Sequence, residues 1–324
     1  MAATDRAAAA RRVLQHGCGL IDRSERGKLA LTGGDAAGLL QGQVTNDVEA
    51  LEPGTGCYAA FLTPKGKMLG DLRILNTGEE LWLDTERVAL QALFNQLRRA
   101  TVGHDAELHK RTLERGLVSL EGPRSRAIAP AGDLPETEHA NRPGEIGGVA
   151  VLTVVTPTGV DLICDAGDVD DLVAALVEAG AEPVPEEAAE ALRVEAGRPR
   201  YGIDLDETVI PQEAGLNSRA VSFTKGCYIG QETVARLFYK GKPNRHLRGL
   251  RLSAPANRGE ALRLAGKPVG TVGSVADSPA HGPIALAIVR REAAPGALVE
   301  VGEGGARAEV VELPFSEPPA DAAG

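Results

Sequence analysis

The residues with the clearest chemical potential lie in one short segment, Thr224 to Glu232, which reads TKGCYIGQE. Cys227 stands there between Lys225 and an amphipathic pattern that begins at Gln231 and predicts a helix. A cation and a helix N-terminus both favour thiolate over thiol, so this position suits a reactive or ligand-contacting cysteine. The alternative is an inert, buried cysteine in a loop that needs glycines, because a free cysteine commonly behaves as a small hydrophobe.

One acidic residue interrupts an apolar strand. Residues 58–62, 63–67 and 68–75 predict a strand, a turn and a strand, which together form a hairpin. Asp71 falls in the second strand, among leucine, isoleucine and methionine. In an alternating strand such a carboxylate lies on the solvent face, which is the ordinary interpretation of this position.

A second acidic residue shares the apolar side of a helix. Residues 186–196 predict a helix in which Glu195 lies on the same face as Ala188 and Leu192. A carboxylate in that position is costly unless it is paired. Two explanations remain open: an ion pair with a nearby arginine such as Arg193, Arg198 or Arg200, or a pocket in which Glu195 accepts hydrogen bonds from the N–H groups of a ligand.

Composition limits the class of protein. The 324 residues are 43% hydrophobic and 25% charged, which is typical of a chain with two or three globular domains. The net charge of −10 argues against a nucleic-acid coat or an anionic membrane as the general partner. The stretch from Lys225 to Arg251 is nevertheless basic, and it either steers an anionic ligand or forms an ordinary solvated face.

Cysteine usage and the N-terminus indicate a compartment. The four cysteines, Cys18, Cys57, Cys164 and Cys227, are far apart and form no CxxC pair. The first residues lack the apolar core of a signal peptide, and no apolar run has the length of a membrane span. We therefore expect a cytoplasmic protein with free thiols and no metal site, and four scattered cysteines do not favour a stable protein-only iron–sulfur cluster.

The order of the predicted elements favours an α+β architecture. The hairpin over residues 58–75 is followed by an amphipathic helix over 87–99 and by further strands, which indicates an antiparallel sheet with helices. Six short β runs with glycine turns between residues 247 and 311 predict a small closed barrel. Neither GxGxxG nor GxxxxGK[ST] occurs, so no motif supports a nucleotide-binding fold.

Three blocks of sequence resemble the YgfZ/GcvT-type folate-binding family, whose other branch is the glycine-cleavage T-protein, an aminomethyltransferase. The blocks are LTGGDAAGLLQGQVTND with the following residues 58–73, then residues 193–197 with 201–204 and 211–216, and KGCYIGQE with Arg236. The cysteine-bearing block resembles the YgfZ branch, because the aminomethyltransferases carry F-I-G-[KR]-E there. In those enzymes a pair of aspartates serves the one-carbon chemistry, and here the pair reads Gly70-Asp71.

The resemblance implies a three-domain, GcvT-like cloverleaf around a tetrahydrofolate channel. Together with the patterns along the chain, it predicts a folate-binding core in residues 1–120 with 186–244, a loop-rich insert and ferredoxin-like portion in 121–185, a barrel in 245–315 and a disordered tail in 316–324. Tetrahydrofolate, or a one-carbon-substituted folate, is the implied cofactor. The implied cofactor-binding residues are Glu195, Asn46, Tyr201, Tyr228, Gln231 and Arg236, and the implied catalytic residues are Cys227, Lys225 and Asp71.

The resemblance also implies a function. The YgfZ branch is associated with assembly or repair of iron–sulfur proteins and, through such enzymes, with tRNA modification. We therefore expect a monomeric accessory protein whose partners are folate and iron–sulfur enzymes or assembly factors, with Cys227 as the essential thiol. Two alternatives stay open: a tetrahydrofolate-dependent aminomethyltransferase, and a tRNA or protein binding module that uses the basic patch at residues 236–251.

Overall fold

The computed structural model describes residues 3–316, and the chain forms two compact units. The first unit comprises residues 3–65, 69–188 and 219–231, and the second comprises 66–68, 189–218 and 232–316. The tail predicted over residues 316–324 lies outside the described residues after Ser316.

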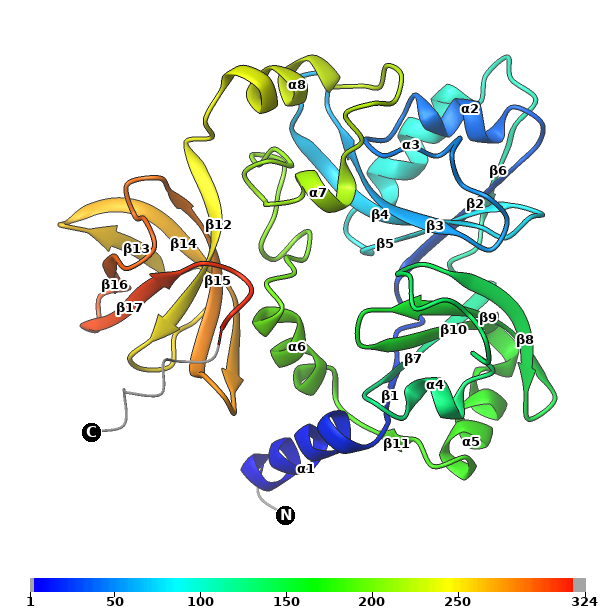
Figure 1. Ribbon diagram of the computed structural model, residues 1–324, viewed down its shortest axis with the longest axis horizontal. Coiled ribbons are helices and arrows are strands. Elements are labelled where there is room, and N and C mark those ends of the chain that lie inside the picture. Colours follow the sequence, from blue (N-terminus) through cyan, green and yellow to red (C-terminus); the bar gives the residue numbers. More distant parts are fainter. Residues whose placement is uncertain (1–2, 317–324) are drawn as a thin grey trace. The chain divides into compact units, whose positions relative to one another are not determined.

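A five-stranded sheet carries the predicted hairpin in the first unit. The strand order is β3-β4-β5-β2-β6, and β2 pairs antiparallel with both of its neighbours. Helices α2 and α3 lie alongside this sheet (Figure 1). The elements are β2 (Gly27–Thr32), α2 (Ala36–Gln41), β3 (Gly56–Leu62), β4 (Met68–Asn76), β5 (Leu81–Thr85), α3 (Leu90–Ala100) and β6 (Glu107–Lys110). The hairpin predicted over residues 58–75 is confirmed by β3 and β4.

The second sheet of this unit has six strands in the order β11-β1-β7-β10-β9-β8. Its core joins Leu172 and Leu176 of α5 to Val118, Leu120 and Val160 of the strands. The elements are α1 (Ala3–His16), β1 (Gly19–Asp22), β7 (Arg115–Glu121), α4 (Ser125–Ile128), β8 (Asn141–Ile146), β9 (Val149–Thr156), β10 (Gly159–Asp165), a 3-10 turn (Ala166–Asp168), α5 (Val169–Glu178) and β11 (Glu182–Pro183). Residues 121–185, expected to be loop-rich, thus supply the four strands β8 to β11 together with α4 and α5.

The two sheets of the first unit meet through an apolar layer and a set of buried charges. Ala30, Leu75 and Trp82 of the five-stranded sheet pack against Leu117 and Ile163 of the six-stranded sheet. Burying side chains from both sheets in one layer stabilises the unit through the hydrophobic effect. The five-stranded sheet is therefore covered on this face as well as on the face that packs against α3.

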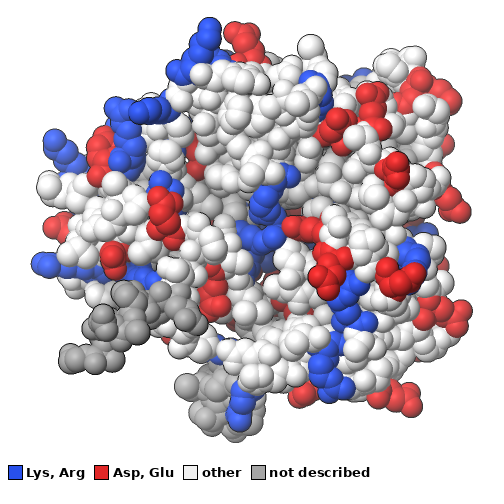
Figure 2. Space-filling view, viewed as in Figure 1, with Lys and Arg blue, Asp and Glu red and all other residues white. Residues whose placement is uncertain are grey.

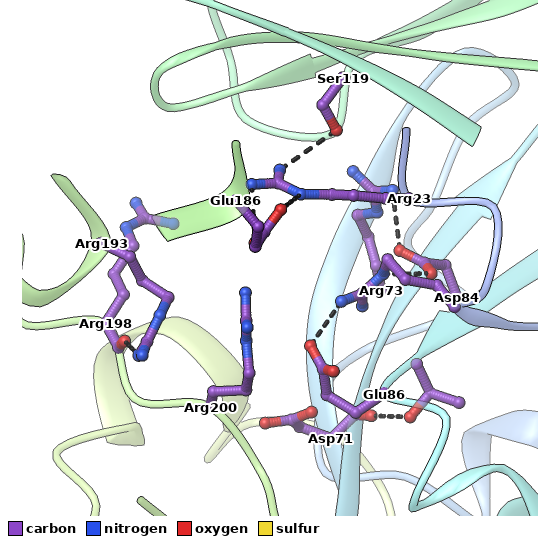
Figure 3. Close-up of polar contacts among 12 residues, drawn as sticks. Arg23, Asp71, Arg73, Asp84, Glu86, Ser119, Glu186, Arg193, Arg198 and Arg200 are labelled. Carbon is purple, nitrogen blue, oxygen red and sulfur yellow. Dashed lines mark hydrogen bonds and ion pairs between the residues drawn. The ribbon is translucent and has the colours of Figure 1, made fainter. Parts of the chain in front are cut away.

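Arg73 of β4 bridges the two sheets. Its guanidinium lies 2.8 Å from Asp84 of β5 and 2.6 Å from Asp161 of β10, and all three side chains are at most 10% exposed. A second arginine, Arg23, pairs with Glu186 at 2.9 Å and donates to Ser119 at 3.1 Å (Figure 3). Buried charges of this kind are stable only because each has its partners.

The second unit contains a closed barrel, drawn in yellow to red in Figure 1. Its strands follow the order β12-β15-β14-β13-β16-β17, and β17 pairs with β12 to close it. They are β12 (Arg245–Leu252), β13 (Ala261–Leu264), β14 (Lys267–Ser278), β15 (Gly282–Arg290), β16 (Leu298–Val301) and β17 (Ala306–Val311). The α+β class with a C-terminal barrel is confirmed.

Three helices cross the boundary between the units, namely α6 (Glu186–Glu195), α7 (Asn217–Ala220) and α8 (Gln231–Lys240). No helix among residues 3–316 is long and apolar enough to span a membrane. Figure 2 shows charged side chains of both signs on one face, separated by wide uncharged areas. Neither positive nor negative charge dominates that face, so the face has no uniform electrostatic potential.

Replacing Arg73 with leucine tests the bridge between the sheets. Arg73→Leu leaves Asp84 and Asp161 buried without this partner, and we expect the free energy of unfolding to fall by about 3–5 kcal/mol. The single tryptophan, Trp82, is buried in β5 and reports urea unfolding of the first unit. Arg115→Leu is the matched control, because the Arg115–Asp165 pair is exposed and should contribute about 1 kcal/mol or less. Equal losses in both variants would contradict a special role for the buried bridge.

Candidate functional site

The cysteine-bearing segment forms a loop that is fixed to the loop after α2. The backbone N–H of Ser222 donates to the carbonyl of Thr45 at 3.0 Å, and that of Ile229 donates to Gly42 at 3.3 Å. The predicted helix begins at Gln231 and is confirmed as α8. Between these two anchors, Cys227 is exposed. Both ends of the loop are therefore fixed by backbone hydrogen bonds, and the Cys227 thiol between them is exposed to solvent.

Cys227 differs in environment from the other three thiols. Cys18 and Cys164 are buried, and burial raises the pKa of each to about 11. Burial raises the pKa of Cys57 to about 12, although the nearby Lys225 lowers it in part. These three thiols stay protonated at neutral pH. Cys227 is exposed, so the interpretation of it as a buried cysteine is wrong, whereas its reactivity remains a prediction.

Lys225 points away from solvent into the loop after α2. Its Nζ donates to the carbonyls of Gln41, Val44 and Asn46 at 2.6, 2.8 and 2.8 Å. An ammonium has three donors, so all of them are satisfied by backbone oxygens. Burial lowers the pKa of Lys225 to about 8. These contacts make Lys225 the anchor of the loop. A catalytic role for Lys225 remains a prediction.

Tyr228 packs under the same loop. It is 8% exposed, its ring centre lies 5.2 Å from the Lys225 Nζ, and burial raises its pKa to about 12. Gln231 reaches back to the carbonyl of Gly226 at 3.5 Å. Both predicted cofactor-binding residues thus belong to the structure of the loop, and binding by either one remains a prediction.

Asn46 connects the loop to the hairpin. Its side-chain Nδ2 donates to the carbonyl of Tyr58 at 2.8 Å and to that of Arg219 at 3.2 Å, and its Oδ1 accepts from the N–H of Asp47 at 2.9 Å. Both amide protons are therefore engaged with backbone. The resemblance placed Asn46 at the folate; in this structure the side chain joins three segments of the first unit.

Asp71 lies inside the first unit, so the solvent-facing interpretation is wrong. The residue is 6% exposed, and its Oδ2 accepts a hydrogen bond from the Tyr58 hydroxyl at 2.7 Å. Strand β4 is covered on both faces, and alternation therefore gives no solvent side. Burial raises the pKa of Asp71 to about 6, which is close to neutral pH for a carboxyl group.

Gly70, the residue in the place of the first aspartate, has no room for a side chain. A Cβ built there would lie 2.5 Å from two ring carbons of Phe61 and 2.6 Å from the Cβ of Ala89. Phe61 and Ala89 are both buried. A second carboxylate at this position would require the ring of Phe61 to move.

Glu195 ends α6 in the second unit and is half-buried beside the buried Ala188, Ala191 and Val194. The arginines proposed as its partners are paired elsewhere: Arg193 contacts Glu190 at 2.7 Å and Arg200 contacts Glu190 at 2.8 Å. Among the described residues, no hydrogen bond or ion pair reaches the Glu195 carboxylate. The ion-pair explanation is therefore wrong, and the ligand-binding explanation remains.

Tyr201 and Arg236 also belong to the second unit. Tyr201 is half-buried in a turn that Asp204 fixes by accepting from the N–H of Arg200 at 2.8 Å and from the hydroxyl of Ser274 at 2.8 Å. Arg236 is exposed on α8. The predicted site residues are thus divided, with Asn46, Asp71, Lys225, Cys227, Tyr228 and Gln231 in the first unit and Glu195, Tyr201 and Arg236 in the second.

Two further residues, Tyr58 and Arg219, surround Asp71 in the first unit. Tyr58 binds Asp71, and the guanidinium of Arg219 lies over the Tyr58 ring at 5.0 Å and pairs with Glu138 at 3.5 Å. The sequence held a partial signal for Tyr58, because the predicted hairpin places Tyr58 and Asp71 on adjacent strands. No comparable signal existed for Arg219, whose contacts span more than 80 residues of sequence.

A groove of about 570 Å³ adjoins the cysteine-bearing loop. Ile229 of the loop lines it together with Leu62, Leu69 and, from α3, Gln96 and Arg99. Its volume lies in the range of small-molecule sites. None of the residues predicted to bind folate lines this groove, so it is distinct from the predicted folate site.

Family models match nearly the whole chain. The GCVT N-terminal domain matches residues 2–225, and the glycine cleavage T-protein C-terminal barrel domain matches residues 245–317. The chain is similar to a putative chloroplastic transferase of Arabidopsis thaliana, with 30% identity over 94% of this chain and 73% of the relative. It is also similar to an aminomethyltransferase of Streptomyces avermitilis, with 32% identity over 92% of this chain and 86% of the relative.

A solved structure shows the same fold. The glycine cleavage system aminomethyltransferase T from Bartonella henselae covers 96% of this chain with a TM-score of 0.85 and 24% sequence identity, and this chain covers 90% of it. The molecule is thus a mixed α/β protein with the architecture of an aminomethyltransferase. The chain belongs to the glycine cleavage T-protein family.

Replacing Lys225 tests the anchor of the loop. Lys225→Met removes the donor for three buried carbonyls, and we expect a loss of about 2–4 kcal/mol in unfolding free energy. Amide hydrogen exchange in residues 222–230 should accelerate before global unfolding occurs. Lys65→Met, at an exposed lysine, is the control and should leave both measurements unchanged. Unaltered exchange in Lys225→Met would show that the loop is held by other contacts.

Proposed function

We propose that the protein binds a reduced folate and acts as an accessory factor in the assembly or repair of iron–sulfur proteins, including those that modify tRNA. Cys227 is its essential thiol. The observation that carries the proposal is the construction of the loop: three hydrogen bonds from a buried lysine fix it, while its cysteine is the exposed one of four. A cysteine with only a structural role would not need to be exposed on a loop that is fixed at both ends.

Glu195 supports the folate part of this proposal. Pterin rings carry N–H donors, and a half-buried carboxylate without a protein partner among the described residues is a suitable acceptor for them. Leaving such a group partly desolvated costs free energy unless a ligand supplies the hydrogen bonds. The residues present therefore fit a reduced folate, which would supply a one-carbon group or a redox-active ring when bound.

Gly70 separates this function from that of the aminomethyltransferases. The resemblance implies two adjacent aspartates for the one-carbon transfer, and only Asp71 is present. The side chain of Phe61 occupies the space that a residue at position 70 would need. We therefore propose a protein that retains folate binding and one carboxylate without the paired arrangement.

An aminomethyltransferase is the second candidate, and a specific observation favours it. A named aminomethyltransferase is 32% identical over most of its length, and Asp71 lies in a buried site with a pKa of about 6. Such a carboxylate can exchange a proton near neutral pH. In this case the protein would pass a methylene group from an aminomethyl donor to tetrahydrofolate.

Folate binding is tested by calorimetry with 5-formyltetrahydrofolate, a reduced folate that is stable in air. We expect Glu195→Gln to weaken binding at least tenfold, because the loss of a charge-assisted hydrogen bond costs roughly 1.5–3 kcal/mol. Glu187→Gln, at an exposed position of the same helix, is the control and should bind like the unmodified protein. Equal binding by Glu195→Gln would remove Glu195 from the site.

The thiol is tested in a strain that lacks the gene and loses iron–sulfur enzyme activity. We expect Cys227→Ala to fail to restore that activity while it still binds the reduced folate, because the thiol lies on a separately anchored loop. Cys57→Ala is the control and should restore activity. Full restoration by Cys227→Ala, together with methylenetetrahydrofolate formation from an aminomethyl donor, would favour the second candidate.

A further inference from the structure

We propose that Tyr58 is a positioning residue for Asp71, and that it fixes one carboxylate oxygen so that the other is left to exchange a proton with a bound substrate. The inference rests on the proposed function only for the identity of that substrate, a reduced folate. It assigns a role to a residue that neither the resemblance nor the sequence patterns select.

The geometry distinguishes the two oxygens of Asp71. The Tyr58 hydroxyl donates to Oδ2 at 2.7 Å, and no other described residue donates to either oxygen of the carboxylate. The main chain is held as well, because the Thr85 hydroxyl donates to the Asp71 carbonyl at 2.5 Å. The carboxylate therefore has a fixed orientation, with Oδ2 occupied and Oδ1 available.

Tyr58 is itself held on two sides. The Asn46 side chain donates to its carbonyl at 2.8 Å, and the Arg219 guanidinium lies over its ring at 5.0 Å. A cation over an aromatic face is attracted by the ring, and the contact restricts the ring's rotation. Arg219 belongs to α7, which leads directly into the cysteine-bearing loop. The phenol is thus placed by the same segments that anchor Cys227.

The charges around Asp71 and the hydrogen bond from the Tyr58 hydroxyl together set the pKa of its carboxyl group. Burial and Glu86 raise the pKa of the carboxyl, whereas the hydrogen bond from Tyr58 and the charges of Arg26 and Arg219 lower it, and the outcome is a pKa of about 6. The hydroxyl hydrogen-bonds to the ionised form and favours it. Without this bond Asp71 would keep its proton closer to neutral pH and would lose its capacity as a base.

The sign of the linkage follows from the raised pKa. Because the folded-state pKa exceeds the ordinary value of 3.8, Asp71 contributes stability that is fully present below about pH 4 and is lost as pH rises through about 6. Removal of the Tyr58 hydroxyl moves the upper end of this window to higher pH. A residue with a merely structural role would change stability equally at every pH in this range.

The experiment measures the titration of Asp71 directly by NMR of protein labelled at the aspartate carboxyl carbon. Loss of one resonance in Asp71→Asn assigns the signal. We expect Tyr58→Phe to raise the pKa of Asp71 by about one unit, since a hydrogen bond to a charged group contributes roughly 1.5–3 kcal/mol. Tyr239→Phe, at a tyrosine that is 67% exposed, is the control and should cause no change.

A second substitution covers the case in which Tyr58→Phe does not fold. Incorporating 3-fluorotyrosine at position 58 makes the phenol a stronger donor, so the pKa of Asp71 should fall instead of rise. An Asp71 titration that is unchanged by the folded variants would overturn the inference. So would a loss of stability that is the same at pH 4 and pH 7.

The outcome is separable from that of the proposed function, because the titration requires no folate. If the pKa of Asp71 moves as expected but no reduced folate binds, the pairing of Tyr58 with Asp71 stands and the proposed function fails. If a reduced folate binds and the pKa does not move, the proposed function stands and Tyr58 has only a structural role.

Discussion

A buried ammonium must find an acceptor for each of its protons, and in this molecule that requirement organises the candidate site. Lys225 satisfies it with three carbonyls of the segment after α2. Those carbonyls must converge, so the segment is folded tightly enough to bring Asn46 to the start of β3. The hairpin then carries Asp71 on β4. One desolvated charge thus links an exposed thiol and a buried carboxylate that are more than 150 residues apart in the chain.

Buried charge also joins the two sheets of the first unit. Arg73 lies on β4, two residues beyond Asp71, and its contacts with Asp84 and Asp161 hold that strand between neighbours from both sheets. A strand fixed on both sides allows little adjustment around the carboxylate. Such rigidity preserves the orientation of a titratable group, which is what proton exchange with a ligand requires.

Much of the fold follows from local sequence, and less of the site does. The hairpin, the barrel and the start of α8 at Gln231 are set by periodicity and glycine turns, which act over short distances. The position of Asp71 does not follow from alternation, because alternation identifies a solvent side only where one exists. The orientation of Lys225 could not be predicted from its sequence neighbours either. Lys225 is two residues from Cys227 in sequence, yet its side chain donates hydrogen bonds to carbonyls that are distant in the sequence. The contacts of Arg219 depend on tertiary structure alone.

The absence of a side chain at Gly70 has a consequence for which substitutions this part of the chain can accept. An aspartate cannot occupy position 70 while the ring of Phe61 fills the same space, and a smaller residue at 61 would leave a cavity while position 70 remains glycine. Each single replacement therefore passes through a less stable protein, whereas the two together need not. Placing a second carboxylate beside Asp71 by design would therefore require positions 61 and 70 to be changed together.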